Sequence, residues 1–338
     1  MNIIIKENHA LKSYNTFGVD AKTSKFFSFK FEDDLIEFIK SGKVEEPVFV
    51  LGGGSNVLFV DDYPGLIIHP ESKGINILED TEVCSVIEVA AGEVWDDFVL
   101  WAVERNYYGI ENLSGIPGSV GAAPVQNIGA YGDEVRNCIK LVKGVDIETG
   151  EQVSFLNFQC KFGYRDSIFK NELKNKVIIT SVHFSLSKIK NFNLSYADIA
   201  NYFKDGVDVS LQAMREAVLK IRDTKLPDPK IIGNGGSFFK NPIVLKSDLE
   251  VLLEKFPDIR YYNFTSNHVK LAAGWLIDQC GLKGFKKDRA GVHENQALVL
   301  VNLGGATGAE IMAVADEVKA QVYKKFGVEL ECEVNILP

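Results

Sequence analysis

The chain has 338 residues, of which 46% are hydrophobic and 25% are charged, the balance of an ordinary globular protein. This length predicts two or three domains. The formal net charge of −9 argues against general nucleic-acid binding, which needs a basic face. An anionic small molecule remains compatible with this charge if lysines and arginines gather locally.

No apolar run is long enough to cross a bilayer, and the N-terminal segment is too mixed and charged for a signal peptide. We therefore expect no membrane partner and a cytoplasmic location. The five cysteines are odd in number and widely spaced, which is typical of reduced thiols rather than of a disulfide framework. The five histidines form no HxH or HxxxH pair, so the sequence predicts no metal site.

The first part of the chain mixes helix and strand patterns. Phe31–Lys40 carries apolar residues at helical spacing, and Pro47–Leu51 is a short apolar strand that leads into the glycine-rich segment Gly52–Asn56. Gly65–His69 is a second predicted strand.

A second region starts near Gly74 and alternates between strands and one irregular segment. It contains, in order, a strand at Val83–Ala90, a helix at Trp95–Arg105, the glycine- and proline-rich segment Glu111–Gly132, a hairpin at Leu141–Phe155 and a strand at Val177–Leu186. The segment Glu111–Gly132 is too punctuated for one regular element.

A helix is predicted at Leu211–Ile221, and the prolines after Thr224 indicate a domain boundary near 224–234. Beyond it, the capping-box patterns at Ser247–Glu250 and Thr307–Glu310 are typical of helix starts. The remaining predicted elements are a helix at Leu271–Cys280, a strand at Ala297–Val301, a long helix at Thr307–Phe326 and a final strand at Val328–Leu337.

Two glycine loops are candidate ligand sites. Gly52–Asn56 follows a strand and can expose backbone N–H groups to a phosphate, although it lacks the Lys-Ser/Thr ending of a Walker A loop. It is also a poor Rossmann fingerprint, because Val57 occupies the third glycine position. An ordinary strand-ending turn explains it equally well.

The second loop, Gly115–Gly132, favours the ligand-binding explanation over an ordinary turn. Two separate phosphate-binding loops suit a long dinucleotide cofactor with a pyrophosphate and a flat ring. Gln126 and Asn127 can hydrogen-bond such a ring, and Tyr131 can stack on one. The alternative is a structural Ω-loop, which is uncommon at this length without a function.

Several blocks of the sequence resemble the MurB family, the UDP-N-acetylenolpyruvoylglucosamine reductases, in the family's own order. Tyr196, within Leu194–Asp198, matches the mobile tyrosine loop of the type I members. The other blocks are Asn15–Gly18, Gly52–Leu58, Gly115–Gly118, Gln126–Gly132, Gly163–Ser167, Gly233–Pro242 and Lys270–Ile277.

The resemblance implies an α+β, three-domain flavoprotein with a vanillyl-alcohol-oxidase-type FAD-binding fold and a separate substrate-binding domain. Residues 1–72 with 327–338 form the first FAD-binding subdomain, 73–226 the second, and 227–326 the substrate-binding domain. The family implies NADPH as co-substrate. The absence of histidine from Gly52–Asn56 predicts a non-covalent FAD.

The resemblance assigns the FAD contacts to the two glycine loops and to one arginine, Arg222. Arg222 could instead end the preceding helix favourably, and the sequence leaves both roles open. The predicted FAD-binding residues are Gly52, Gly53, Gly54, Ser55, Asn56, Ile116, Pro117, Gly118, Ser119, Gly121, Gln126, Asn127, Gly129, Ala130, Tyr131 and Arg222.

The implied reaction is NADPH-dependent reduction of UDP-N-acetylglucosamine enolpyruvate to UDP-N-acetylmuramate, in peptidoglycan precursor synthesis. One alkene carbon takes a hydride, and the other becomes an enolate or carbanion that needs a proton. By resemblance Ser237 is the proton donor, and its glycine-rich surroundings allow close approach. A hydrogen-bonded turn serine is the ordinary alternative.

Two further residues are predicted to be catalytic. Arg165 can grip a carboxylate or enolate through parallel N–H bonds, although a surface ion pair with Asp166 is the simpler explanation. Glu331 and Glu333 fall on one side of the final strand, and the family pattern selects Glu333. A buried, protonated glutamate can donate a hydrogen bond to the enolate. The family usually has proline at Cys332, which affects only the local backbone.

The substrate's diphosphate needs cations and polar partners, and a lone lysine would otherwise serve only solubility. By resemblance the substrate-binding residues are Tyr196, Lys225, Asn241, Tyr262, Lys270, Lys283 and Gln296. We expect a monomer that acts on a nucleotide-sugar substrate. The alternatives are another non-covalent FAD oxidase or dehydrogenase of the same fold, or a flavin-binding module without catalytic turnover.

Overall fold

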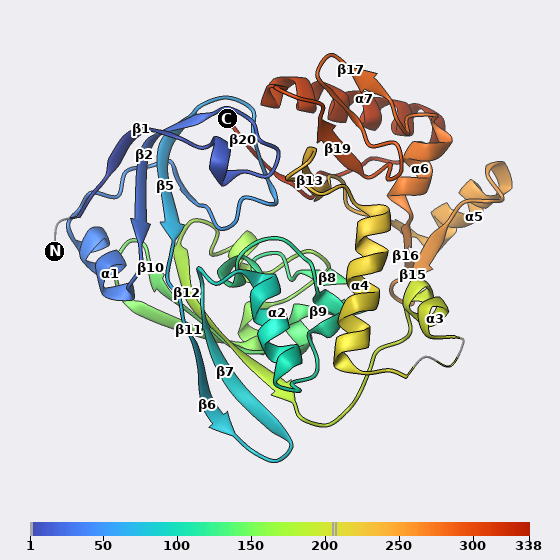
Figure 1. Cartoon of the computed structure of the whole chain (residues 1–338). Coiled ribbons are helices and arrows are strands. Elements are labelled where there is room, and N and C mark those ends of the chain that lie inside the picture. The colour runs from blue at the N-terminus through green and yellow to red at the C-terminus, as the bar shows by residue number, and fades with distance from the viewer. Residues whose placement is uncertain (1–2, 205, 207) are drawn as a thin grey trace. The chain divides into compact units, whose positions relative to one another are not determined.

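The computed structural model describes residues 3–204, 206 and 208–338 (Figure 1). It divides into two compact units, each assembled from separate stretches of chain. The first unit contains the residues up to His9, Thr23–Gly54 and Pro64–Thr224. The second contains Ala10–Lys22, Ser55–Tyr63 and Lys225–Pro338. None of the described helices is long and apolar enough to cross a membrane.

The first unit begins with a four-stranded sheet in the order β1-β2-β5-β3, in which β3 and β5 run parallel. Helix α1 covers it with Leu35, Phe38 and Ile39, the apolar positions of its helical pattern. The rings of Phe27 and Phe38 stack with their centroids 3.9 Å apart. The elements are β1 Lys6–Ala10, β2 Lys22–Phe29, α1 Glu32–Lys40, β3 Val48–Val50 and β5 Tyr63–Pro70.

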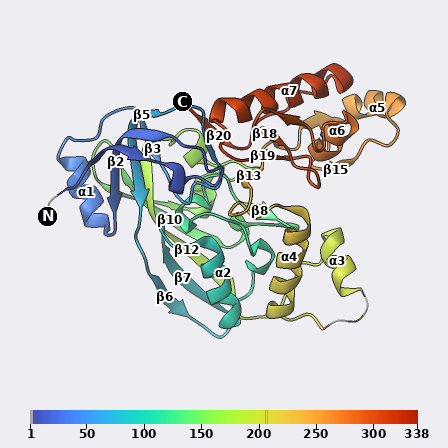
Figure 2. The ribbon, with the colours of Figure 1, turned by 45° about the horizontal axis from the view of Figure 1, so that its top comes forward.

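A five-stranded antiparallel sheet in the order β11-β10-β12-β7-β6 forms the rest of the unit's frame. Helix α2 packs on one face (Figure 2), and there the ring centroids of Phe98 and Phe184 lie 4.9 Å apart. The elements are β6 Ile75–Asp80, β7 Cys84–Ala90, α2 Trp95–Glu104, β10 Ile139–Asp146, β11 Gln152–Leu156 and β12 Val177–Ser187.

The segment between α2 and β10 is irregular, as its glycines and prolines predict. It contains short 3-10 turns at Glu111–Leu113, Val120–Ala122 and Val135–Asn137, and the small strands β8 Gly129–Ala130 and β9 Asp133–Glu134. Two helices end the unit, α3 Ala197–Phe203 and α4 Leu211–Lys225. Because α4 continues past Ile221, Arg222 lies within the helix rather than beyond its end.

The second unit has a sheet in the order β13-β19-β18-β17, a smaller sheet in the order β14-β16-β15, and β20 paired in parallel with β4. Its strands are β4 Val57–Phe59, β13 Gly233–Ser237, β14 Ile243–Leu245, β15 Tyr261–Asn263, β16 His268–Leu271, β17 Lys286–Lys287, β18 Ala290–Val292, β19 Val299–Asn302 and β20 Asn335–Leu337. Its helices are α5 Lys246–Lys255, α6 Ala273–Gln279 and α7 Gly308–Phe326.

The predicted capping box of α7 is confirmed, because Thr307 and Glu310 exchange side-chain and backbone hydrogen bonds. The box at Ser247 is wrong: β14 ends at Leu245, and α5 begins immediately after it. The helix expected from Leu271 starts at Ala273, because Leu271 pairs in β16. Of the final strand only Asn335–Leu337 is regular.

Candidate active site

The two glycine loops meet inside the first unit. A Cβ on Gly53 would lie 2.8 Å from the Cα of Gly118, and a Cβ on Gly52 would collide with the hydroxyl of Ser119. Backbones can approach this closely only where side chains are missing. The paired glycines therefore form a single backbone-lined cradle rather than two separate turns.

One polar group of this cradle, the hydroxyl of Ser119, lacks a hydrogen-bond partner in the described structure. Its Oγ is buried. A buried hydroxyl normally has a partner, so an orphaned one calls for an explanation. A phosphate oxygen of a dinucleotide such as FAD would accept its hydrogen bond, and the glycines would give that phosphate access to the backbone.

An ion pair supports the second glycine loop from behind. Arg215 on α4 donates two hydrogen bonds of 2.6 and 2.7 Å to the carboxylate of Asp96, in the first turn of α2. The same carboxylate accepts the N–H of Gly115 at 2.5 Å. Burial alone would raise the pKa of Asp96, but the hydrogen bonds from Arg215 and Gly115 outweigh it and lower that pKa.

Arg222 lies beside the same loop. A Cβ on Gly115 would come within 3.1 Å of the Arg222 Nε, and the guanidinium hydrogen-bonds the hydroxyl of Tyr131. Burial raises the pKa of Tyr131 to about 12, so its hydroxyl is neutral near pH 7. Arg222 therefore joins α4 to two parts of the second glycine loop, around Gly115 and around Tyr131.

Tyr196 lies against Tyr131. The ring centroids are 5.3 Å apart at an interplanar angle of 87°, an edge-to-face contact. Below them the buried amide of Asn112 donates to the carbonyls of Tyr131 at 3.0 Å and Asn193 at 2.9 Å. The segment that leads to Tyr196 is thus fastened to the Tyr131 segment.

Arg165 also lies against the second glycine loop. One of its guanidinium nitrogens donates to the carbonyl of Gly129 at 2.6 Å, and its backbone has the left-handed φ of +53°. Behind it the side chain of Asn127 is fully buried and donates to the carbonyl of Gly163. The side-chain amide of Asn127 is therefore used within the protein.

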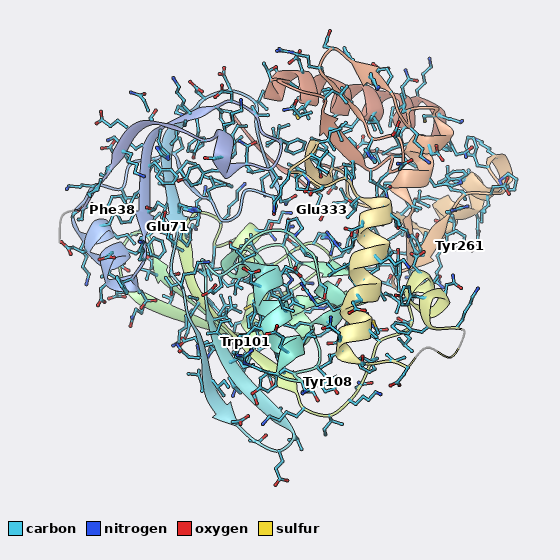
Figure 3. The ribbon with its side chains drawn as sticks, viewed as in Figure 1. Phe38, Glu71, Trp101, Tyr108, Tyr261 and Glu333 are labelled. Carbon is cyan, nitrogen blue, oxygen red and sulfur yellow. The ribbon has the colours of Figure 1, made fainter. Side chains whose placement is uncertain are left out.

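Ser237 and Glu333 lie on adjacent segments of the second unit. Phe239 pairs with Cys332, and the N–H of Glu333, the residue labelled in Figure 3, donates to the carbonyl of Phe238 at 2.8 Å. Glu331, which spacing alone could not separate from Glu333, instead pairs at 3.1 Å with Lys240, and its side chain is 77% exposed.

Most of the predicted substrate-binding residues of this unit lie around α6 and the smaller sheet. Tyr262 and Lys270 face each other across β15 and β16. Asn241 accepts the N–H of Ala273 at 3.0 Å, and Gln296 lies near Gly274 in the first turn of α6. Lys225 is the last residue of α4, and Lys283 is exposed in the turn after α6.

Sequence reasoning missed the supporting residues, Asp96, Arg215, Asn112 and Asn193. Their partners are far away along the chain, so no local spacing indicates them. Two acidic residues in the first turn of α2, Asp96 and Asp97, were the available signal, and they are equally typical of a helix start.

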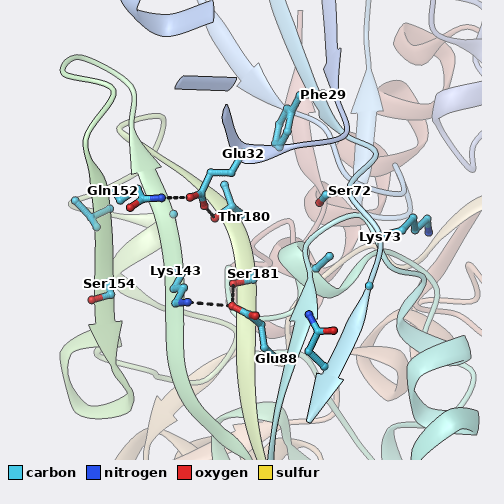
Figure 4. A pocket seen from close by; sticks show the side chains of 15 residues that line it. Phe29, Glu32, Ser72, Lys73, Glu88, Lys143, Gln152, Ser154, Thr180 and Ser181 are labelled. Atoms are coloured by element: carbon cyan, nitrogen blue, oxygen red, sulfur yellow. Dashed lines mark hydrogen bonds and ion pairs between the residues drawn. The ribbon is translucent and has the colours of Figure 1, made fainter. Parts of the chain in front are cut away.

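A separate pocket of about 420 Å³ lies on the face of the five-stranded sheet away from α2 (Figure 4). Its polar groups bind one another. Glu32 accepts hydrogen bonds from Gln152 and Thr180, and Lys143 donates to Glu88 at 3.0 Å. This mutual pairing satisfies the charges without a ligand.

Comparison with known proteins agrees with this geometry. A family model described as an FAD binding domain matches residues 25–155. A second, the C-terminal domain of UDP-N-acetylenolpyruvoylglucosamine reductase, matches residues 228–337. The α+β class and the FAD-binding fold predicted from the sequence are confirmed.

Curated relatives match over nearly their whole length. The UDP-N-acetylenolpyruvoylglucosamine reductase of Flavobacterium johnsoniae is 48% identical, with 98% of this chain and 99% of the relative covered. That of Chromobacterium violaceum is 46% identical, with both chains fully covered. The crystal structure of the Thermus caldophilus reductase (MurB) matches both whole chains with a TM-score of 0.69 at 22% identity, which supports the fold.

Proposed function

Because this chain belongs to the UDP-N-acetylenolpyruvoylglucosamine reductase family, we propose that it reduces UDP-N-acetylglucosamine enolpyruvate to UDP-N-acetylmuramate with NADPH. This reaction is a step of peptidoglycan precursor synthesis. The observation that carries the proposal is 48% identity over 98% of the chain. We further propose that the protein is a cytoplasmic monomer whose substrate is the nucleotide sugar.

The cofactor is FAD, which when bound passes a hydride from NADPH to the enolpyruvyl group. In the proposal the glycine cradle holds its pyrophosphate, and Ser119 donates a hydrogen bond to a phosphate oxygen. Arg222 supports this site through Tyr131 and the Gly115 segment. The remaining FAD contacts are those predicted for Gly52–Asn56 and Ile116–Tyr131.

Three residues carry the proposed chemistry. Arg165 supplies a fixed positive charge for the carboxylate and the developing enolate. Ser237 gives its hydroxyl proton to the carbon next to the carboxylate, which is basic enough to take it from an ordinary serine. Glu333, on the segment hydrogen-bonded next to Ser237, orients the enolate or donates a hydrogen bond to it.

The diphosphate and sugar are the proposed ligands of the remaining set. Lys225, Lys270 and Lys283 supply positive charge, and Tyr196 covers the diphosphate. Asn241, Tyr262 and Gln296 supply hydrogen bonds. We also propose three functional parts: 1–72 with 327–338 and 73–226 for FAD, and 227–326 for the substrate.

One titration tests the proposal. The purified protein should show flavin absorbance that NADPH bleaches without oxygen and that the enolpyruvyl nucleotide sugar restores. Restoration by oxygen alone would favour another FAD oxidase of this fold. A yellow protein that NADPH does not bleach would favour a non-catalytic flavin-binding module, and a protein that cannot take up FAD would refute all three functions.

A further inference from the structure

The side chain of Asn127 connects three segments around Arg165. Its Nδ2 donates to the carbonyl of Gly163 at 2.8 Å and to the Glu134 carboxylate at 3.0 Å. Its Oδ1 accepts the backbone N–H of Arg136 at 3.1 Å. The side chain is 0% exposed, so no solvent competes for these bonds.

The turn that carries Arg165 is held at several points, because Lys170 donates to the carbonyl of Arg165 at 3.4 Å and Asn171 donates to the carboxylate of Asp166 at 2.8 Å. It is a tight reversal in which the N–H of Gly163 donates to the carbonyl of Asp166 at 2.9 Å. Arg165 itself has φ +53°, a conformation that costs a side-chain-bearing residue of order 1 kcal/mol. Such a turn persists only where its surroundings fix it, and the bond from Asn127 to Gly163 lies at its base.

The other end of this link is the second glycine loop, Gly115–Gly132, called the flavin loop from here on. Asn127 precedes Gly129, whose carbonyl accepts the Arg165 guanidinium at 2.6 Å. The backbone of the Gly163–Asp166 turn and the guanidinium of Arg165 therefore both hydrogen-bond the segment Asn127–Gly129. A second tie joins the same segments, because Ser167 donates to the carbonyl of Val125 at 2.6 Å.

We propose that Asn127 is a positioning residue for the reaction: its amide fixes the Gly163–Asp166 turn on the flavin loop and thereby aims the Arg165 guanidinium. This inference rests on the proposed function, since it assigns Arg165 the role of substrate cation. Asparagine suits the position because it tolerates the left-handed φ of +44° and offers two donors and an acceptor.

Asn127→Asp is the sharpest change, because aspartate has the same shape and can still accept from Arg136. It cannot donate to Gly163, and it places a second carboxylate beside Glu134. Adding Glu134→Gln removes that repulsion but does not restore the Gly163 bond. Glu134→Gln also removes the charge that pairs with Arg136 at 2.8 Å, so the single variant Glu134→Gln is the reference for the double variant, which serves if Asn127→Asp alone does not fold.

Two controls match the change. Asn201→Asp makes the same substitution at an exposed position of α3. Asn175→Ala removes an exposed asparagine that also has a left-handed φ, of +59°, so it measures the backbone cost alone. Neither residue belongs to the proposed site.

The experiment has two readouts. Hydrogen exchange of the peptide containing Gly163–Asp166, measured without FAD, should become about tenfold faster in Asn127→Asp and in the double variant, the effect of one lost hydrogen bond. With FAD bound, flavin reoxidation by the enolpyruvyl nucleotide sugar should slow by about 10²-fold, the cost of a catalytic group misplaced by about 1 Å. Bleaching by NADPH should stay near the wild-type rate.

Unchanged exchange in both Asn127 variants would overturn the inference, and so would an equal loss in the two half-reactions. The controls should behave like the wild type in both readouts. Failure of the proposed function looks different: the wild-type protein itself would not be reoxidised by the nucleotide sugar. The exchange comparison without FAD would still report whether Asn127 holds the turn.

Discussion

The two units present their functional residues in opposite ways. In the first, the loops are fixed by side chains that are almost wholly buried, such as Asn112 at 1% and Asn127 at 0% exposure. In the second, several predicted substrate residues lie on the surface of short elements, such as Tyr262 at 52% exposure and Lys283. One unit is organised before a ligand arrives, and the other exposes side chains that a ligand must order.

This difference has an energetic meaning. A site held by buried hydrogen bonds has already incurred the entropy cost of ordering during folding, so it binds and aims without further loss. An exposed lysine or tyrosine loses rotamer freedom only when the ligand binds, at roughly 0.5–1.5 kcal/mol per side chain. We therefore expect changes in the first unit to affect FAD and Arg165, and changes in the second to affect the substrate.

The largest expected effect tests the second unit's role in the substrate step. Ser237→Ala removes the proposed proton donor, so flavin reoxidation by the nucleotide sugar should slow by roughly 10²–10⁴-fold. The rate of flavin bleaching by NADPH should change little. Stopped-flow absorbance without oxygen measures the two rates separately.

Ser237→Cys is the matched control, because a thiol can also give a proton. It should retain more substrate-step activity than Ser237→Ala. If both half-reactions stayed fast in Ser237→Ala, the serine would not be the donor, and the assignment of this chemistry to the second unit would fail.

Arg165→Met tests whether the first unit also acts on the substrate. Methionine keeps much of the side-chain volume but removes the charge, so the substrate step should slow by roughly 10²–10³-fold, as for a lost oxyanion donor. Arg105→Met, at an exposed position of the same unit, should leave both steps unchanged. A loss confined to flavin bleaching by NADPH would contradict the role given to Arg165.

The features of the two units that the sequence predicted are those with a local sequence pattern. The loops and the resemblance blocks are local patterns, and so is the capping box of α7. The bonds from Asn127 to Gly163 and from Arg215 to Asp96 join residues 36 and 119 positions apart. Such pairs have no local signature, so the supporting half of the first unit's site was missed.

The same limit applies to Glu333. Alternation put Glu331 and Glu333 on one side of an expected strand, and only the family pattern chose between them. In the structure, regular strand pairing begins only at Asn335, beyond both glutamates. Glu331 forms an ion pair with Lys240 at the surface. Period-2 reasoning is unreliable where a segment has a single bridge, here at Cys332, rather than a ladder.

Gly53→Ala tests the glycine cradle, with a smaller expected effect. The new Cβ would lie 2.8 Å from the Gly118 Cα, backbone that cannot turn aside as a flexible side chain would. We expect a cost of about 2 kcal/mol from overpacking. If the loops separate to relieve it, FAD affinity should fall roughly thirtyfold, which a titration of apoprotein with FAD measures.

Gly274→Ala adds the same methyl group in the second unit, where the nearest atom would be at an ordinary 3.4 Å. It should leave FAD affinity unchanged. Wild-type FAD affinity in Gly53→Ala would show that the contact between the two loops is not part of the cofactor site.

Asp96→Asn has the smallest expected effect. It tests a residue that supports the second glycine loop but is not predicted to contact FAD. Asparagine can still accept from Gly115 but no longer carries the charge that pairs with Arg215, so the free energy of unfolding of the apoprotein should fall by about 1.5 kcal/mol at neutral pH. The apoprotein is the right state to measure, because bound FAD would itself raise the melting temperature.

The pH dependence of this stability gives the decisive check. Because the folded-state pKa of Asp96 lies below its usual 3.8, the unfolded chain takes up the proton more readily. The stabilisation by Asp96 is therefore full above about pH 3.8 and is lost as the pH falls through the lower, folded-state pKa. Melting temperatures of wild type and Asp96→Asn should thus differ most at neutral pH and converge in acid. Curves that stay parallel through this range would mean that the Asp96 charge does not stabilise the first unit, and the support of the flavin loop would then rest on its neutral hydrogen bonds.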